Sequence, residues 1–187
     1  MTSNAKVALV TGASRGLGRN MAIALARKGV DVIGSYHSNK AEADGAAAAI
    51  EALGRKAAMF QLDTGRIADF APFAAKLKRA LAEGWSRSNF DYLVNNAGIG
   101  IHSPFAETAE ADFDRLMNIH LKGVFFLTQT LLPLIADGGR IVNLSSGLAR
   151  FSLPGYAAYS AMKGGVEVLT RYLAKELGPR EIGRAHV

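Results

Sequence analysis

Residues 11–18 read Thr-Gly-Ala-Ser-Arg-Gly-Leu-Gly and end a short apolar run that begins at Lys6. Glycine permits sharp turns and lets a ligand approach the backbone closely. Apolar residues at helical spacing follow over residues 16–28, so the loop leads into a helix N-terminus, which favours an anion. A glycine-rich turn without a ligand is the alternative. The place of the loop directly after the first expected strand favours a phosphate-binding loop.

Strand-like and helical segments alternate along the rest of the chain. Strands are expected over residues 6–11, 30–36, 56–62, 90–95 and 139–145. Helices are expected over residues 16–28, 40–53, 66–83, 107–117, 119–136 and 156–177. This alternation predicts an α/β fold with a Rossmann-type doubly wound parallel sheet in three α/β/α layers. Ligands of such sheets bind beyond the carboxyl ends of the strands, where the strand order reverses.

Composition limits the function classes. The 187 residues carry a net charge of +6, but the 22 Lys and Arg residues form no basic stripe and no nucleic-acid motif is present. The chain has no cysteine, so disulfides and thiolate metal sites are excluded. No apolar stretch reaches the roughly 18 residues of a membrane span, and no signal-peptide layout occurs. We therefore expect a cytoplasmic protein that acts on a small molecule, without membrane or nucleic-acid partners.

The end of the second expected strand bears on the choice of dinucleotide. Residues 35–39 read Ser-Tyr-His-Ser-Asn, with no carboxylate. NAD sites usually place an acidic residue here for the ribose hydroxyls, and an acid would repel a 2′-phosphate that Arg15 would attract. The sequence therefore predicts NADP(H) in preference to NAD(H). Ordinary loop polarity is the alternative for His37 and Ser38.

Two further strand ends carry candidate ligand residues. Asp63 follows the third strand, where its carboxylate could accept a hydrogen bond from an adenine amino group; a helix cap or an Asx turn is the alternative. Residues 95–98, Asn-Asn-Ala-Gly, end the fourth strand. Small residues at this point allow a flat ring or a ribose to approach the backbone.

A tyrosine and a lysine carry the expected proton chemistry. Tyr159 and Lys163 are spaced i, i+4 in an expected helix, so their side chains lie on one face. A free tyrosine has a pKa near 10, and a neighbouring ammonium favours the phenolate form. Tyr159 can then exchange a proton with a substrate oxygen, and the Ser146 hydroxyl can hydrogen-bond the same oxygen. An ordinary amphipathic helix is the alternative for this spacing.

Taken together, these motifs resemble those of the short-chain dehydrogenase/reductase family. Within the family, the sequence is most similar to the 3-oxoacyl-carrier-protein-reductase-like members. The resemblance implies an oxidoreductase that moves hydride between NADP(H) and a carbonyl/alcohol pair, with Ser146, Tyr159 and Lys163 catalytic. It also implies a homodimer or homotetramer through the helices at 119–136 and 156–177. The residues expected to bind the cofactor are Gly12, Ser14, Arg15, Gly16, Leu17, Gly18, His37, Ser38, Asp63, Thr64, Asn95, Ala97, Gly98, Tyr159 and Lys163.

One position departs from the family pattern. The family has a catalytic asparagine where this chain has His120, while Asn118 lies two helical steps away and faces elsewhere, since two steps turn a helix by about 200°. In the family the backbone carbonyl of this residue holds a water that leads to the lysine. We keep His120 as a candidate catalytic residue; a histidine that only packs between helices is the alternative.

The expected domain spans residues 1–180, without the last strands of the family fold, so strand 139–145 is expected to be an exposed edge. Residues 181–187, Glu-Ile-Gly-Arg-Ala-His-Val, resemble the translation of a sequencing-library adapter, and we hypothesise that they are not native. The hypothesis is wrong if independent genomic sequence encodes residues 181–187 followed by a stop codon. On this hypothesis the 187-residue chain expresses poorly or lacks turnover, whereas the product of the full gene is active.

Other function classes remain open at this stage. A regulatory homologue could bind the cofactor without turnover, although the intact Ser146, Tyr159 and Lys163 argue against it. An epimerase or dehydratase could use the same pair, but such proteins usually show a different glycine spacing and a following substrate domain.

Overall fold

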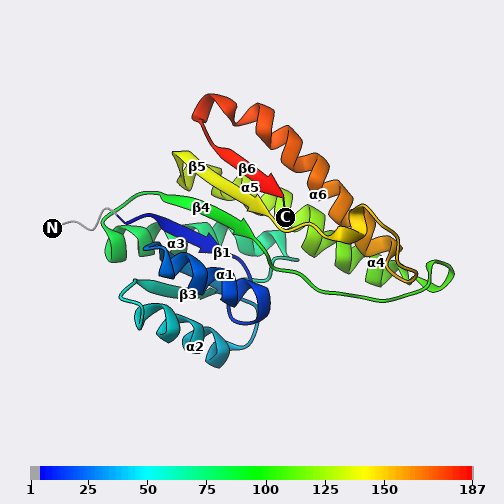
Figure 1. Cartoon of the computed structure of the whole chain (residues 1–187), viewed down its shortest axis with the longest axis horizontal. Helices are drawn as coiled ribbons and strands as arrows, with labels where there is room; N and C mark the ends of the chain where they lie inside the picture. Colours follow the sequence, from blue (N-terminus) through cyan, green and yellow to red (C-terminus); the bar gives the residue numbers. More distant parts are fainter. Residues whose placement is uncertain (1–4, 187) are drawn as a thin grey trace.

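The computed structural model describes residues 5–186, which contain a six-stranded parallel sheet (Figure 1). Its strand order is β3-β2-β1-β4-β5-β6, and the order reverses between β1 and β4, as the predicted doubly wound fold requires. The strands are β1 (Val7–Val10), β2 (Asp31–Tyr36), β3 (Ala57–Gln61), β4 (Phe90–Asn95), β5 (Ile135–Asn143) and β6 (Gly183–His186).

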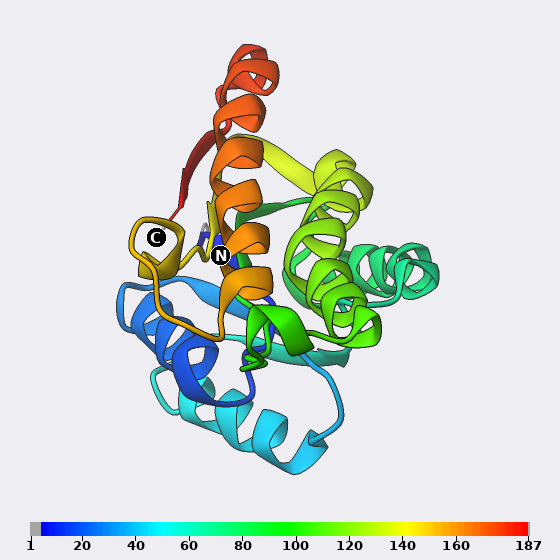
Figure 2. The ribbon, with the colours of Figure 1, turned by 90° about the vertical axis from the view of Figure 1, so that its right-hand side faces the viewer.

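Helices cover both faces of the sheet (Figures 1 and 2). The helices α1 (Gly16–Arg27) and α2 (Lys40–Glu51) pack on one face. The opposite face carries α3 (Phe70–Trp85), α5 (Gly123–Leu131) and α6 (Ala157–Glu176), while α4 (Glu110–Met117) precedes α5. Short turns complete the chain: η1 (Ile67–Asp69), η2 (Phe105–Glu107), η3 (Asn118–Lys122), η4 (Leu132–Leu134), η5 (Gly147–Ala149) and η6 (Gly178–Arg180).

Two buried clusters hold these layers together. On the α3 and α5 side, Phe70, Leu77 and Leu131 pack against the sheet at or below 1% exposure. On the α1 and α2 side the cluster uses smaller residues, such as Ala22 and Ala26, so these helices approach the sheet closely. All four residues of β1 are buried, which is expected of a central parallel strand covered on both faces.

The helix expected over residues 119–136 is divided into three parts. A π-helical turn, η3, precedes α5, and the 3₁₀ turn η4 follows it. Pro133 lies in η4 and has no N–H to donate, so the regular helix ends before it. The chain enters β5 at Ile135 and makes a bulge around Gly138, whose φ is +74°. Strand β5 therefore begins earlier than the sequence predicts.

The prediction that β5 forms an exposed edge is wrong. Strand β6 pairs with it in parallel, from Arg140 opposite Gly183 to Asn143 opposite His186. Ile182, which is 1% exposed, anchors the return of the chain in the core. Gly-Arg-Ala-His has little of the β-branched character that marks a strand, so pattern alone missed β6. The adapter origin of residues 181–187 stays a hypothesis.

Within residues 5–186, none of the helices combines the length and the apolar character that a membrane crossing requires.

Candidate active site

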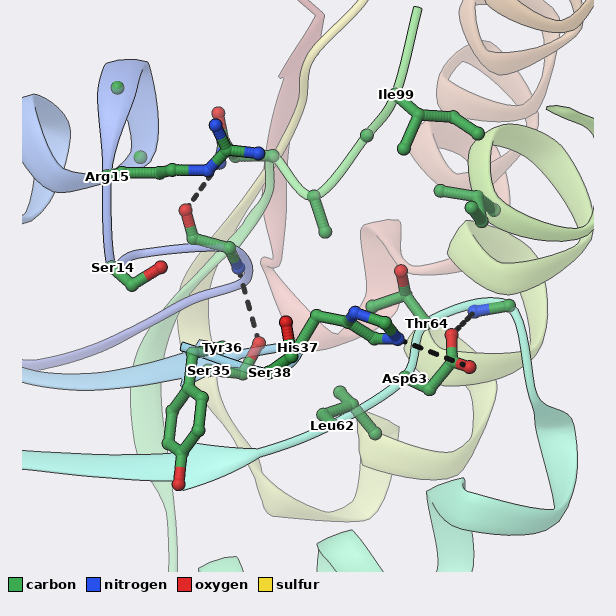
Figure 3. Close-up of a pocket in the computed structure, with 18 of the residues that line it drawn as sticks. Ser14, Arg15, Ser35, Tyr36, His37, Ser38, Leu62, Asp63, Thr64 and Ile99 are labelled. Atoms are coloured by element: carbon green, nitrogen blue, oxygen red, sulfur yellow. Dashed lines mark hydrogen bonds and ion pairs between the residues drawn. The ribbon is translucent and has the colours of Figure 1, made fainter. Parts of the chain in front are cut away.

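A cavity of about 850 Å³ lies over the carboxyl ends of β1, β2, β3 and β4. It runs from the glycine loop after β1 across the ends of β2 and β3 to the segment after β4, and Figure 3 shows side chains from these segments facing it. The predicted cofactor residues that line it are Gly12, Ser14, Arg15, Gly16, Leu17, Gly18, His37, Ser38, Asp63, Thr64, Ala97 and Gly98.

The glycine loop has no room for a side chain at Gly18 and has a positive φ at Gly12. A Cβ on Gly18 would lie 2.2 Å from the carbonyl oxygen of Gly12, and Gly12 itself has a φ of +66°. Helix α1 begins at Gly16, its first turn contains no acidic residue, and Arg15 precedes it in extended conformation. A helix N-terminus with free amides and no neighbouring carboxylate is suited to a phosphate group.

Two residues that the sequence analysis did not single out fix the shape of this loop. The Thr11 hydroxyl accepts hydrogen bonds from the backbone N–H groups of Asn96 and Ala97, at 2.9 and 3.0 Å. The Asn96 side-chain amide donates to the carbonyl oxygens of Thr11 and Gly12, at 2.8 and 3.2 Å. We call these four hydrogen bonds the Thr11–Asn96 brace. It joins the ends of β1 and β4, the two strands at which the order reverses.

The part of the cavity near the ends of β2 and β3 is polar. The Asp63 carboxylate accepts from the Gly65 N–H at 2.8 Å, which is an Asx turn, and its second oxygen lies 3.7 Å from Nε2 of His37 (Figure 3). The Asx-turn alternative is therefore correct for one carboxylate oxygen. Arg15 lies across the cavity from this pair (Figure 3). Glu42 of α2 also lines the cavity, a carboxylate that the sequence analysis did not weigh.

Asn95 does not line this cavity, so the structure does not support its predicted contact with the cofactor. Its side chain is 5% exposed and donates to Asn143 of β5 at 2.8 Å and to the Thr128 hydroxyl of α5 at 3.0 Å. The Asn95 side chain, at the end of β4, therefore links β4 to the neighbouring strand β5 and to α5. Asn96, one residue later, is the member of the pair that faces the cavity.

A second cavity, of about 530 Å³, adjoins the first through the shared residues Leu17, Asn96, Gly98 and Ile99. It brings together all four predicted catalytic residues: Ser146 after β5, Tyr159 and Lys163 of α6, and His120 of η3. Asn118 instead lines the first cavity, as the helical geometry predicts. The Ser146 oxygen accepts from the Leu148 N–H at 3.2 Å, which leaves its hydrogen for another acceptor.

Lys163 is held beside the tyrosine ring. Its Nζ lies 5.7 Å from the centroid of the Tyr159 ring and donates to the Leu144 carbonyl oxygen at 2.6 Å. The side chain is buried, and this burial lowers the pKa of Lys163 to about 8. Near neutral pH the ammonium form prevails, but it is one that releases a proton more readily than an exposed lysine does.

His120 is enclosed by the same groups. Its ring meets the Tyr159 ring edge to face, with 5.1 Å between centroids, and its Nε2 lies 2.7 Å from the Ile99 carbonyl oxygen. Burial, followed by the nearby Lys163 charge, lowers the pKa of His120 to about 4 although the contact with Ile99 opposes the shift. The imidazole is therefore neutral at pH 7.

Comparison with known proteins assigns the family. Residues 6–186 match the family model described as short chain dehydrogenase. The chain belongs to the short-chain dehydrogenase/reductase family. It is 38% identical over 177 residues to an uncharacterized oxidoreductase of Methylorubrum extorquens, and this match covers 95% of the chain and 69% of that relative.

Two solved structures that are similar to this short-chain dehydrogenase/reductase are those of ketone reductases. The promiscuous reductase LugOII, which catalyses keto-reduction at C1 during lugdunomycin biosynthesis, matches with a TM-score of 0.94 at 37% identity, over 100% of this chain and 74% of that one. The angucycline C-6 ketoreductase LanV with bound NADP matches with a TM-score of 0.93 at 36% identity, over 97% and 70%. Enzymes of the family are oxidoreductases, as the sequence predicts.

Proposed function

We propose that this short-chain dehydrogenase/reductase reduces a ketone with NADPH, using Tyr159 as the proton donor, Lys163 as its charged neighbour and Ser146 as the hydrogen-bond donor to the ketone oxygen. One observation carries the proposal. The cavity lined by these three residues adjoins the cavity built on the glycine loop, and Gly98 and Ile99 line both. A hydride donor held in the first cavity would therefore meet a substrate held in the second.

The residues of the first cavity fit a dinucleotide. The absence of side-chain room at Gly18 and the α1 N-terminus suit the pyrophosphate, and Ala97 and Gly98 let a flat ring approach the backbone. Asp63 and His37 line the same cavity and would hold the adenosine part. When bound, the nicotinamide supplies the hydride. Residues of the protein supply the orientation and the proton.

Each catalytic side chain has one task in this mechanism. The Ser146 hydroxyl, whose oxygen already accepts from Leu148, donates its hydrogen to the substrate carbonyl oxygen and fixes it near Tyr159. The Tyr159 hydroxyl transfers its proton to this oxygen as the carbonyl carbon is reduced. The Lys163 ammonium, oriented by Leu144, stabilises the negative charge that then develops on the phenol oxygen. Reduction therefore needs protonated Lys163 and weakens as pH rises through about 8.

The second cavity indicates the substrate class. Its apolar lining comes from Leu17, Ile99, Leu148 and Leu153 together with the Tyr156 ring, and Lys163 is its one charged residue among those described. Lys163 is engaged with the tyrosine and with Leu144, so nothing else there would neutralise a carboxylate or phosphate on the substrate. These walls favour an uncharged, largely apolar ketone.

We expect the protein to oxidise NADPH with an uncharged bicyclic ketone such as 1-tetralone. Its kcat/KM for this ketone should exceed that for an anionic 2-keto acid at least a hundredfold, because desolvating an unpaired carboxylate costs several kcal/mol. A 3-oxoacyl thioester, assayed in the same way, tests the resemblance of the sequence to 3-oxoacyl-carrier-protein reductases. Absorbance of NADPH gives the rates. A preference for the keto acid would contradict the proposed substrate class.

The preference for NADP(H) is also part of the proposal. Arg15 lines the first cavity and residues 36–39 carry no carboxylate, and LanV was solved with NADP bound. Removing the guanidinium in Arg15→Ala should reduce the ratio of NADPH to NADH affinity about tenfold, or about 1.4 kcal/mol. Arg19→Ala removes an arginine of α1 that does not line the cavity and serves as the control. Fluorescence titration with both cofactors measures the ratio; an unchanged ratio in Arg15→Ala would exclude this role.

A further inference from the structure

The face of α6 that carries Tyr159 and Lys163 also carries a glutamate. Tyr159, Lys163 and Glu167 are spaced i, i+4 and i+8, so their side chains lie in a row along the helix. The Glu167 side chain is 17% exposed and contacts the segment that follows β5. The proposed mechanism gives this carboxylate no task, although the segment it contacts carries Ser146.

Glu167 contacts this segment on both sides of Ser146. Ahead of the serine, the Ser145 hydroxyl donates to a Glu167 carboxylate oxygen at 2.9 Å. Beyond it, Nε of Arg150 lies 4.0 Å from the same oxygen. The Ser145 hydroxyl oxygen also lies 3.3 Å from the Lys163 carbonyl oxygen, but it has one hydrogen to give, and the carboxylate is the closer and stronger acceptor. One carboxylate therefore joins both ends of the segment to α6.

The part of the segment between these contacts is a tight turn, η5. The Ser146 hydroxyl oxygen accepts from the Leu148 N–H at 3.2 Å and caps the turn. The Ala149 N–H donates to the Ser146 carbonyl oxygen at 3.0 Å, and the Arg150 N–H donates to the Gly147 carbonyl oxygen at 2.9 Å. Because the turn is bonded internally, its contacts with α6 determine where the Ser146 hydroxyl lies relative to that helix.

We propose that Glu167 is a positioning residue whose carboxylate holds the segment 145–150 against α6. It thereby places the Ser146 hydroxyl where it can donate to the carbonyl oxygen that Tyr159 protonates. The catalytic consequence rests on the proposed function, whereas the ordering of the segment belongs to the free protein. Two hydroxyls that act on one oxygen must be placed closely, because a displacement of about 1 Å can reduce the rate about a hundredfold.

The first experiment makes Glu167→Leu in two backgrounds. Leucine accepts no hydrogen bond, so kcat for 1-tetralone should fall about tenfold; the loss is partial because Lys163 still donates to the Leu144 carbonyl oxygen and retains the start of the segment. In a Ser146→Ala background the same substitution should lower kcat less than twofold, because no hydroxyl is left to misplace. A tenfold loss in both backgrounds would indicate a general structural role and overturn the proposal.

Two further variants serve as comparisons. In Glu167→Gln the amide oxygen can still accept from Ser145, so kcat should stay within threefold of the unsubstituted protein. Glu176→Leu makes the same change as Glu167→Leu at an exposed glutamate in the last turn of α6 and should leave kcat unaltered. NADPH affinity should stay within twofold in every variant, since neither glutamate lines the first cavity. A glutamine variant as slow as the leucine variant would exclude the hydrogen bond as the cause.

Hydrogen exchange in the cofactor-free protein separates this inference from the proposed function. The amides of Leu148 and Ala149 should exchange at least fivefold faster in Glu167→Leu and at the original rate in Glu167→Gln. Unchanged exchange in Glu167→Leu overturns the proposal. If exchange rises but Ser146→Ala reduces the ketone at full rate, the proposed function is wrong while the positioning of the segment stands. If Glu167→Leu does not fold, Ser145→Ala removes the same hydrogen bond and carries both tests with the same expected results.

Discussion

Tyr159→Phe is expected to lower kcat for ketone reduction about a thousandfold, which lies within the range for loss of a positioned general acid. The substitution removes the hydroxyl while keeping the ring that packs on His120 and faces Lys163, so the fold and both cavities remain. NADPH affinity should change less than threefold, because the glycine loop and the segment after β4 are untouched. Stopped-flow or steady-state loss of NADPH absorbance, with a fluorescence titration of NADPH, gives the two quantities.

Tyr156→Phe is the matched comparison. Tyr156 lines the same cavity and lies 6.4 Å from Tyr159 between ring centroids, but Ser160 and not a lysine follows it at i+4. Loss of its hydroxyl should act mainly through KM and by less than tenfold. Equal losses of kcat in the two variants would show that the proton donor has been assigned to the wrong tyrosine.

Gly18→Ala is expected to weaken NADPH binding about a hundredfold, or about 2.7 kcal/mol. The added methyl group would lie 2.2 Å from the Gly12 carbonyl oxygen and 2.4 Å from the Asn96 side-chain nitrogen. Both atoms belong to the Thr11–Asn96 brace, so the loop must shift as a unit and the amides that face the phosphates move with it. Fluorescence titration of NADPH measures the loss.

Gly45→Ala provides the control, because nothing lies within 4 Å of a Cβ added at this helical glycine of α2. It should raise the free energy of unfolding by about 0.5–1 kcal/mol and leave NADPH affinity unaltered. If Gly18→Ala binds NADPH as tightly as Gly45→Ala does, close packing of the glycine loop is not what shapes the site.

The sequence predicts most of the sheet because burial on both faces leaves continuous apolar strands. It predicts that Tyr159 and Lys163 lie side by side, because residues spaced i, i+4 share one face of a helix; their catalytic role stays a proposal. The sequence does not show which of two adjacent asparagine side chains faces the cavity. Asn95 and Asn96 are chemically identical, and only the pairing of β4 with β5 shows that the Asn95 side chain points toward Asn143. It also fails for β6, whose place depends on the path of α6 and on the burial of Ile182 rather than on its own composition.

The enclosure of His120 is likewise a tertiary property. The sequence shows a histidine where the family has asparagine, but the burial of its ring arises from Gly98, Ile99 and α6 meeting around η3. A π-helical turn, which often marks functional positions, has no reliable local signature.

The Thr11–Asn96 brace also has a consequence for the rate at which cofactor is exchanged. Because its four hydrogen bonds form within the protein, the loop has its shape before any nucleotide arrives. We therefore expect nucleotide binding to order few residues of this loop, which reduces the entropic cost of binding. A reductase must replace its spent cofactor in every catalytic cycle. A loop that neither folds nor unfolds in this step adds no delay to turnover.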